Sequence, residues 1–342
     1  MDPHYFFTSI TRISNLQDSP FDVEKLPRSQ WQSGDYVIGE AITCPGCLHR
    51  IEQPNGRMVE VVDGELVVGA FGERAATLEA VGSWQAIGDD QRFELMTAGG
   101  LFGKVTSKSF YLPPLMSLQY HGHVLRDGQK VDMTQFVSRQ PFIPFPLPII
   151  LIIGTSMSAG KTTAAKIIVR QLKQAGYRTI GAKLTGAARY RDILSIADAG
   201  ADYIFDFVDA GLPSSICDPE HYRRQLRILM SEMARLDADV LVAEAGASPL
   251  EPYNGSVAME ELAPQVCCTV LCASDPYAVL GVASAFQCQP DIIAGAATNT
   301  SAAIDLLGRL TGGEGLNLLD KKSLPRLNEI LSACLARQRH DR

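Results

Sequence analysis

The sequence lacks a long uninterrupted apolar segment. Its longest apolar run, FIPFPLPIILII over residues 142–153, contains three prolines and falls short of the ~18 apolar residues that a membrane-spanning helix needs. The first residues, MDPHYFFTSITRISN, have no basic segment followed by an apolar stretch, which is the pattern of a secretory signal. We therefore expect a cytoplasmic protein without a membrane partner.

An excess of basic residues is also missing. The chain has 31 Lys and Arg against 38 Asp and Glu, a formal net charge of −7, and a pI near 5.4. Surfaces that wrap nucleic acid are basic, so we expect no nucleic-acid partner. Eight cysteines in 342 residues are too few for a disulfide scaffold. Three of them, Cys267, Cys268 and Cys272, lie in the apolar run QVCCTVLCAS and are predicted to be core thiols.

The first part of the chain has the pattern of β-structure. Between residues 31 and 137, short apolar runs such as YVIGEAI, ELVVGAFG, SWQAIG and SLQYHGHVL alternate with turn residues such as PNGR and RDGQ. This spacing is typical of an all-β barrel or sandwich. The segment SRQPFIPFPLP then predicts a stiff proline-rich connection. We expect a β-rich domain over residues 1–140 and a second domain over residues 141–342.

The second part alternates apolar strands with helices. The strands are predicted at IILII, TIGAKL, YIFDFV, DVLVAEA, CCTVLCA, DIIAGAA and LNLL. The helices are predicted over Thr162–Ala175, His221–Leu236, Ala278–Phe286, Ser301–Leu310 and Leu324–Ala336. Such alternation indicates an α/β fold with a doubly wound, mostly parallel sheet, which binds ligands at the carboxyl ends of its strands.

A loop of small residues, within IIGTSMSAGKTTAAK, joins the first of these strands to a helix. Small residues allow backbone N–H groups to face a phosphate, and the start of the helix adds its own N–H groups and dipole. Lys161 is placed to reach the outer phosphates, and the Thr162 hydroxyl is placed to bind Mg²⁺. Gly154 and Gly160 are separated by five residues instead of the common four. The predicted nucleotide-binding residues are Gly154, Ser156, Ser158, Ala159, Gly160, Lys161, Thr162 and Thr163.

Charged residues stand at the ends of two other predicted strands. Glu244 interrupts the apolar stretch of DVLVAEAGAS, where an acid beside a phosphate loop can bind Mg²⁺. Lys183 stands just inside the end of TIGAKL, where it would suit an anionic substrate or a developing negative charge. Asp192 is a candidate second metal ligand or a helix cap. Further substrate candidates in this loop are Thr185, Gly186, Arg189 and Arg191.

The loop DFVDAGLPSS closes the third of these strands. Asp206 and Asp209 could bind metal, orient substrate or cap a helix, while Ser214 and Ser215 are candidate ligands of a substrate carboxylate. A second open question is CPGCLH in the β-rich half, with Cys44 and Cys47. A zinc site there would need further ligands such as His121 and His123, and an ordinary Pro-Gly turn is the alternative.

The segments IIGTSMSAGKTT, GAKLTG, YRD and VLVAEAGA resemble dethiobiotin synthetase in order and spacing, over roughly residues 148–299. The resemblance implies that Lys161 and Thr162 bind phosphates and Mg²⁺. It also implies that Asp192 and Glu244 complete the metal site, that Lys183 faces the substrate, and that Asn299 contacts the base.

The sequence departs from that family at two places. Lys183-Leu184 replaces a Lys-Pro pair, and residues 244–247 read Glu-Ala-Gly-Ala where the family has Glu-Gly-Ala-Gly. The β-rich half is also foreign to it. The nucleotide machinery is therefore carried over and the biotin-pathway substrate is not. The chain is similar as well to a P-loop family with a separate N-terminal domain, which includes D-glutamate N-acetyltransferases.

These observations lead to three hypotheses. The first is ATP- and Mg²⁺-dependent phosphoryl transfer to a small carboxylate-bearing metabolite, as a kinase or as a ligase acting through an acyl-phosphate, with Lys161 and Lys183 as catalytic residues. The second is transfer of an acyl group from coenzyme A to an amino acid. The third is a nucleotide-gated switch or metallochaperone. A homodimer is compatible with the sequence.

Overall fold

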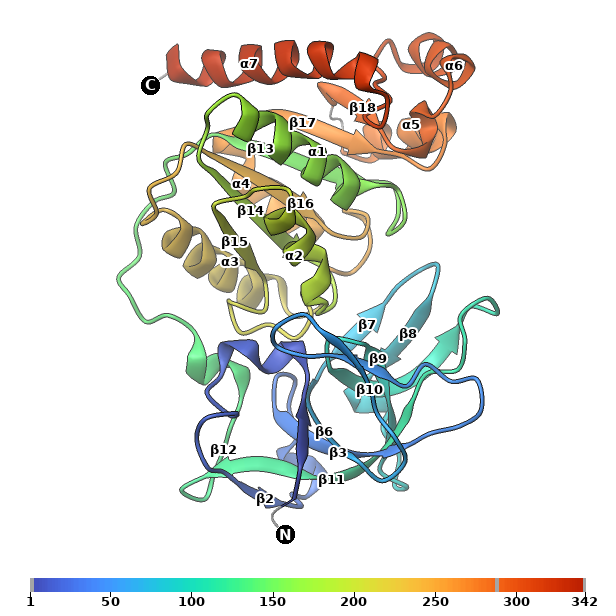
Figure 1. Ribbon diagram of the computed structural model, residues 1–342, viewed down its shortest axis with the longest axis vertical. Coiled ribbons are helices and arrows are strands. Elements are labelled where there is room, and N and C mark those ends of the chain that lie inside the picture. Colours follow the sequence, from blue (N-terminus) through green and yellow to red (C-terminus); the bar gives the residue numbers. More distant parts are fainter. Residues whose placement is uncertain (1–2, 287–288, 341–342) are drawn as a thin grey trace. The chain divides into compact units, whose positions relative to one another are not determined.

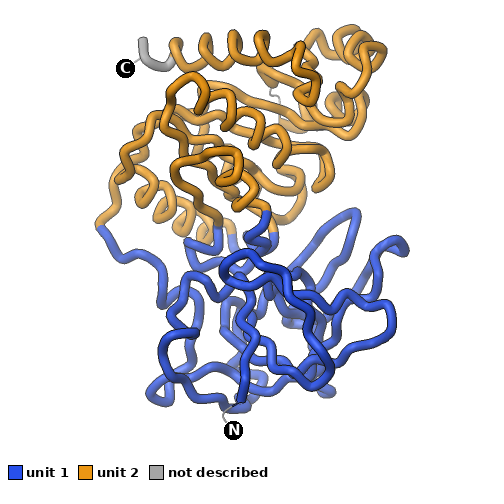
Figure 2. The backbone as a smooth tube through the Cα atoms, viewed as in Figure 1, with its two compact units in different colours: residues 1–140, 187–191, 207–218 blue, residues 141–186, 192–206, 219–342 orange. Residues whose placement is uncertain are grey.

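The computed structural model describes residues 3–286 and 289–340, and it divides the chain into two compact units (Figure 2). Unit 1 contains Met1–Gln140 together with two later segments, Ala187–Arg191 and Phe207–Asp218. Unit 2 contains Pro141–Gly186, Asp192–Asp206 and Pro219–Arg342. The two later segments of unit 1 come from the part of the sequence assigned above to the second domain. The chain therefore passes between the units several times.

Unit 1 is built around a closed β-barrel. Its five strands pair in the ring β6–β3–β11–β9–β10, and β10 returns to β6 in a parallel pairing that closes the barrel. The strands are β3 (Tyr36–Ile42), β6 (Leu66–Phe71), β9 (Arg92–Thr97), β10 (Leu101–Lys108) and β11 (Ser117–Arg126). The predicted mostly-β architecture of this half is therefore confirmed.

The barrel interior is filled by apolar side chains from alternate positions of these strands. Phe93, Phe102 and Leu118 are fully buried there, and Trp31 covers them from a loop. One predicted strand is wrong, because SWQAIG contains a 3₁₀ turn, η3 (Trp84–Ala86). The Ser83 hydroxyl accepts a hydrogen bond from the Gln85 N–H and starts that turn. A short polar cap thus overrides the apolar pattern.

Short elements surround the barrel. The strands are β1 (Tyr5–Phe7), β2 (Asp22–Glu24), β4 (Arg50–Glu52), β5 (Met58–Glu60), β7 (Glu73–Ala75), β8 (Ala80–Ser83) and β12 (Gln129–Lys130). The 3₁₀ turns are η1 (Ser9–Ile13), η2 (Arg28–Gln30) and η4 (Met133–Phe136).

Unit 2 contains a six-stranded sheet in the order β15-β14-β16-β13-β17-β18, and every pairing in it is parallel. The strands are β13 (Ile149–Gly154), β14 (Thr179–Thr185), β15 (Tyr203–Asp206), β16 (Val240–Ala245), β17 (Val266–Cys272) and β18 (Ile292–Ala294). All residues of β13, β14 and β16 are buried, as expected for strands covered on both faces. The run LNLL, predicted as a strand, is not one.

The helices of unit 2 join these strands (Figure 1). They are α1 (Lys161–Gln174), α2 (Tyr190–Asp198), α3 (Pro219–Met233), α4 (Gly255–Leu262), α5 (Pro276–Phe286), α6 (Ser301–Thr311) and α7 (Leu324–His340), with 3₁₀ turns η5 (Ala263–Gln265), η6 (Ala296–Thr298) and η7 (Lys321–Ser323). The two short helices α2 and α4 were not among the predicted ones. Among the residues that the structure describes, no helix combines the length and apolar character needed to cross a membrane.

The strand order fixes which face each helix covers. The chain moves from β13 through β14 to β15 toward one edge, and then from β15 through β16 and β17 to β18 toward the other. Because such crossovers are right-handed, α1 and α2 lie on one face and α3, α4 and α5 on the opposite face. The sheet is therefore doubly wound, as predicted. The strands on the two sides of β13 are therefore reached by crossovers that run in opposite directions. Ligands of doubly wound sheets bind at the carboxyl ends of the strands where the direction changes.

Candidate functional site

The predicted phosphate loop directly follows β13, where the winding direction of the sheet changes. Gly160 precedes α1 with a left-handed φ of 98°. A Cβ atom on Gly154 would lie 2.8 Å from Cδ and 3.0 Å from Nζ of Lys161, so the lysine side chain folds back over this glycine. The Nζ atom donates to the Ser156 carbonyl oxygen at 2.7 Å. The loop thus holds a lysine ammonium against its own backbone.

Lys161 is a buried cation, with 2% of its surface exposed. Burial lowers its pKa, and the negative charge of Glu244 opposes this effect without cancelling it. A phosphate group beside Lys161 would stabilise the ammonium by replacing the solvation that burial removes. The position therefore suits an anionic ligand.

A hydroxyl and a carboxylate meet beside the lysine. Thr162 Oγ1, in the first turn of α1, donates to Glu244 Oε2 at 3.0 Å. Glu244 is buried near the end of β16 and is registered against Ile152 of β13. Hard oxygen ligands of this kind fit Mg²⁺, which needs one or two protein ligands in addition to phosphates and water.

A second buried lysine lies on the next strand. Lys183 of β14 is in register with Glu244 on one side and Asp206 on the other, and its ammonium forms an ion pair with Asp192 of α2. Burial lowers the pKa of Lys183, but Asp192, Glu244 and Asp206 together raise it more, so the net shift is upward. Lys183 therefore carries its positive charge at neutral pH.

The predicted substrate residues divide between the two units. Thr185 is fully buried and its hydroxyl donates to the Gly246 carbonyl oxygen at 2.9 Å, so it joins the ends of β14 and β16. Gly186 follows it with a φ of 134°. Arg189 is exposed and belongs to unit 1, as do the buried Ser214 and Ser215.

Further polar and charged residues of these loops form hydrogen bonds or ion pairs within the protein. Arg12 and Asp209, both in unit 1, form an ion pair at 2.9 Å. Ser214 Oγ accepts a hydrogen bond from the Ile216 N–H at 3.2 Å. Arg191 donates its backbone N–H to the carboxylate of Glu52, a residue that the sequence analysis did not identify.

A cavity of about 180 Å³ is lined by residues of the phosphate loop and of the first turn of α1. Asn299, the predicted base contact, lines it together with Asn317. The other lining residues are Ser158, Ala159, Gly160, Thr163, Ala164, Gly295, Ala296, Leu318 and Leu319. The Asn317 amide donates to the Asn299 carbonyl oxygen at 3.4 Å. The structure thus brings Asn299 to the loop, 135 or more residues away in sequence, and adds Asn317, which the strand prediction for LNLL concealed.

The cysteines of CPGCLH form a local turn. The Cys44 N–H donates to Cys47 Sγ at 3.2 Å. His123 has its ring nitrogens against the Tyr120 hydroxyl at 2.5 Å and Asp35 at 3.2 Å inside unit 1. Within residues 3–286 and 289–340, the group of three or more His, Cys and acidic ligands that does converge is elsewhere, at Cys268, Asp291 and Cys334.

No family model matches the chain, and no curated protein sequence does. Among solved structures, HypB from Helicobacter pylori in complex with nickel is 15% identical, with 56% of this chain and 88% of that chain covered and a TM-score of 0.39. The cell division protein FtsY from Thermotoga maritima is 18% identical, with 53% and 64% covered and a TM-score of 0.34. A ParA family ATPase from Chlorobium tepidum is 14% identical, with 55% and 90% covered and a TM-score of 0.32.

These likenesses concern the fold alone. The P-loop α/β class rests on the parallel sheet, its doubly wound order and the phosphate loop of this chain. The resemblances to dethiobiotin synthetase and to the D-glutamate N-acetyltransferase family remain expectations from the sequence.

Proposed function

We propose that this protein binds ATP and Mg²⁺ and transfers the γ-phosphoryl group to a small carboxylate-bearing metabolite. The observation that carries the proposal is a row of charges across three adjacent strands. Lys161 follows β13, Glu244 lies on β16 beside it, and Lys183 lies on β14 beyond. Phosphoryl transfer depends on positioning and on neutralising charge, which two lysines and a metal site at one sheet edge would provide.

The metal would be held by Thr162 and Glu244, whose oxygens already lie 3.0 Å apart. Asp192 is the proposed third ligand, and it would then exchange its ion pair with Lys183 for the metal. Bound Mg²⁺ supplies positive charge to the phosphates. Lys183, released from Asp192, would face the charge that develops between γ-phosphate and acceptor.

The residues that line the cavity at Asn299 support the choice of adenine over guanine in this proposal. Asn299 and Asn317 offer amides, and the described residues that line the cavity include no carboxylate. An amide can donate to and accept from the adenine edge at once. Guanine presents two adjacent donors, which are better matched by a carboxylate.

A nucleotide-gated switch is the second candidate, and one observation favours it. The segments that follow β14 and β15, residues 187–191 and 207–218, belong to unit 1. The ion pair of Lys183 with Asp192 brackets the first of them. Replacing this pair by nucleotide and metal would therefore act on a segment that belongs to unit 1.

The deciding experiment measures ADP release by the full chain with Mg²⁺ across a pool of small carboxylic acids and amino acids. Release that requires an acceptor supports phosphoryl transfer. Slow, acceptor-independent release points to the switch. No ADP with any acceptor, together with free thiol released from acetyl-coenzyme A, would overturn both in favour of the acyltransferase.

A further inference from the structure

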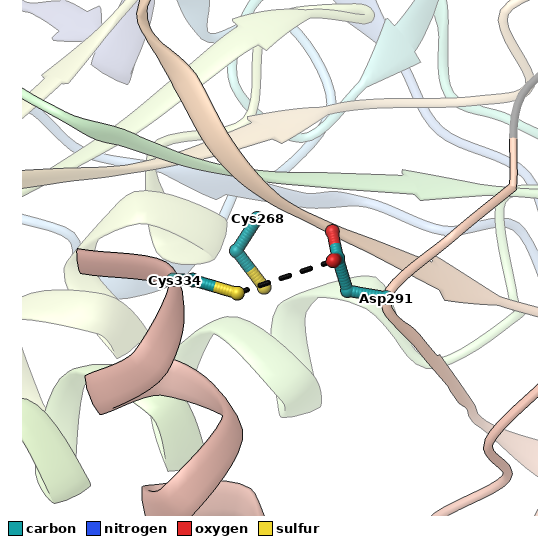
Figure 3. Close-up of side chains that lie close together, drawn as sticks. All are labelled: Cys268, Asp291 and Cys334. Atoms are coloured by element: carbon teal, nitrogen blue, oxygen red, sulfur yellow. Dashed lines mark hydrogen bonds between the residues drawn. The ribbon is translucent and has the colours of Figure 1, made fainter. Parts of the chain in front are cut away.

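Three metal-binding groups, two cysteine thiols and one carboxylate, converge at the end of the sheet opposite the phosphate loop. Cys268 lies on β17, Asp291 directly precedes β18, and Cys334 lies on α7 (Figure 3). Their ligand atoms all lie within 4.8 Å of one another. Both cysteines are fully buried. Residues of a strand, a helix and the loop before β18 thus direct their ligand atoms to one point.

The cluster is distinct from the proposed nucleotide site. On β17, Cys272 is in register with Gly154 at the start of the phosphate loop, whereas Cys268 is in register with Ile150. Four residues along a strand correspond to about 13 Å. A metal bound at this cluster would therefore be independent of the proposed nucleotide site.

The spacing of Cys334 Sγ and Asp291 Oδ1 is close to that of two ligands in a tetrahedral metal centre. Cys334 Sγ and Asp291 Oδ1 are 3.9 Å apart. A zinc ion bound to one sulfur and one oxygen at tetrahedral angles would hold these atoms about 3.6 Å apart. A shift of a few tenths of an ångström, within reach of side-chain rotation, would bring this pair to that separation.

Neighbouring groups orient the carboxylate and balance the charge. The Thr269 N–H donates to Asp291 Oδ2 at 2.8 Å, which leaves Oδ1 directed at Cys334. Arg337 Nη2 lies 3.0 Å from Cys334 Sγ and 3.6 Å from Asp291 Oδ1. Two thiolates and one carboxylate carry three negative charges, which a divalent ion and one guanidinium neutralise. Residues around a metal site commonly form hydrogen bonds with the metal-binding side chains and so hold them in place.

We propose that Cys268, Asp291 and Cys334 bind a thiophilic divalent cation of the zinc type, with water as the fourth ligand. Arg337 is the outer partner of the Cys334 thiolate. Its side chain is 67% exposed. The bound ion joins α7 to β17 and to the start of β18, and it stabilises this edge of unit 2.

The test uses the full chain, reduced and treated with chelator, and titrates it with Co²⁺ and then Zn²⁺. We expect one Co²⁺ per chain with a thiolate-to-cobalt charge-transfer band and tetrahedral d–d absorption, both removed by Zn²⁺. Cys334→Ser and Cys268→Ser should weaken Zn²⁺ binding at least about tenfold, and Asp291→Asn should weaken it as well. Cys267→Ser is the matched control, because its thiol contacts the Ile149 carbonyl oxygen instead, and it should bind as wild type does.

The wild-type Co²⁺ spectrum is informative even if a cysteine variant fails to fold. Absence of the charge-transfer band in wild type would overturn the proposal. Equal affinity in wild type and a folded Cys334→Ser would do so too, because the ion would then bind at other cysteines. A Cys268–Cys334 disulfide in non-reducing peptide maps, combined with no Zn²⁺ binding by the reduced chain, would replace the metal site by a redox pair.

Discussion

The hydroxyl of Thr162 and the carboxylate of Glu244 are 82 positions apart in sequence and share a 3.0 Å hydrogen bond at the carboxyl end of the parallel sheet. Without metal this bond occupies the two oxygen groups that we assign to Mg²⁺. Binding of the ion therefore has to exchange it for two metal–oxygen contacts. Because Glu244 is assigned to the ion, its effect on Mg²⁺ binding can be measured separately from nucleotide binding.

Glu244→Gln should keep the shape and the hydrogen bond to Thr162 but lose the negative charge. We expect the Mg²⁺ concentration that gives half-maximal turnover to rise about tenfold or more, with a smaller change in ATP affinity. Turnover measured across a Mg²⁺ titration checks this. An unchanged Mg²⁺ dependence would remove Glu244 from the metal site.

Lys161→Ala should reduce nucleotide turnover about a hundredfold or more, because it removes the cation placed for the phosphates. Lys166→Ala, on the exposed side of the same helix, is the matched control and should behave as wild type does. Circular dichroism establishes that both variants are folded. Normal turnover by a folded Lys161→Ala protein would contradict the phosphate-loop assignment.

Lys183→Met should bind ATP with near-normal affinity and release ADP about a hundredfold more slowly. The reason is that Lys183 would act on charge that develops during transfer, so its loss affects kcat more than binding. Equilibrium ATP binding and single-turnover ADP formation separate the two quantities. A large loss of ATP affinity with normal kcat would place Lys183 at the nucleotide instead of the acceptor.

Glu52→Gln should lower the free energy of unfolding by about 1–3 kcal/mol. The Glu52 carboxylate is buried and accepts hydrogen bonds from the Ser9 hydroxyl at 2.6 Å and from the N–H groups of Tyr190 and Arg191, at the start of α2, at 2.8 and 2.6 Å. Gln can replace only part of these bonds and lacks the charge that favours a helix start. Urea unfolding measures the change, with Glu40→Gln, an exposed position on β3, as control. Equal stability of the two variants would refute a structural role of the Glu52 charge.

The parts of the site that could be predicted from the sequence are those encoded locally. The phosphate loop has its small residues, Lys161 and Thr162 within one short stretch between a strand and a helix. Glu244 and Lys183 could be found because each interrupts an apolar strand at its end. Parallel strands bring such ends to one edge, so their proximity followed from the fold class.

The parts that were missed depend on partners distant in sequence. Glu52 has an unremarkable local sequence, and its contacts with Ser9, Tyr190 and Arg191 reveal it. Cys268 was predicted to be a core thiol, and it is buried, but its neighbour Cys334 is 66 positions away on α7. Asn317 stands between two leucines, so its apolar context predicted a strand and concealed an amide that lines the cavity. The spacing of apolar residues predicts which face of a helix or strand is buried, but it does not predict which polar groups come together in the folded protein.

The interleaving of the chain also has a consequence for dissecting the protein. Its path changes unit after residues 140, 186, 191, 206 and 218. A truncation at the proline-rich connection would therefore deprive the barrel of two segments, including the N–H groups that satisfy Glu52, and would leave the sheet with two orphaned loops. Neither half is expected to fold on its own. Recombination between relatives would have to exchange both halves together, so the barrel and the phosphate loop are expected to be inherited as one piece.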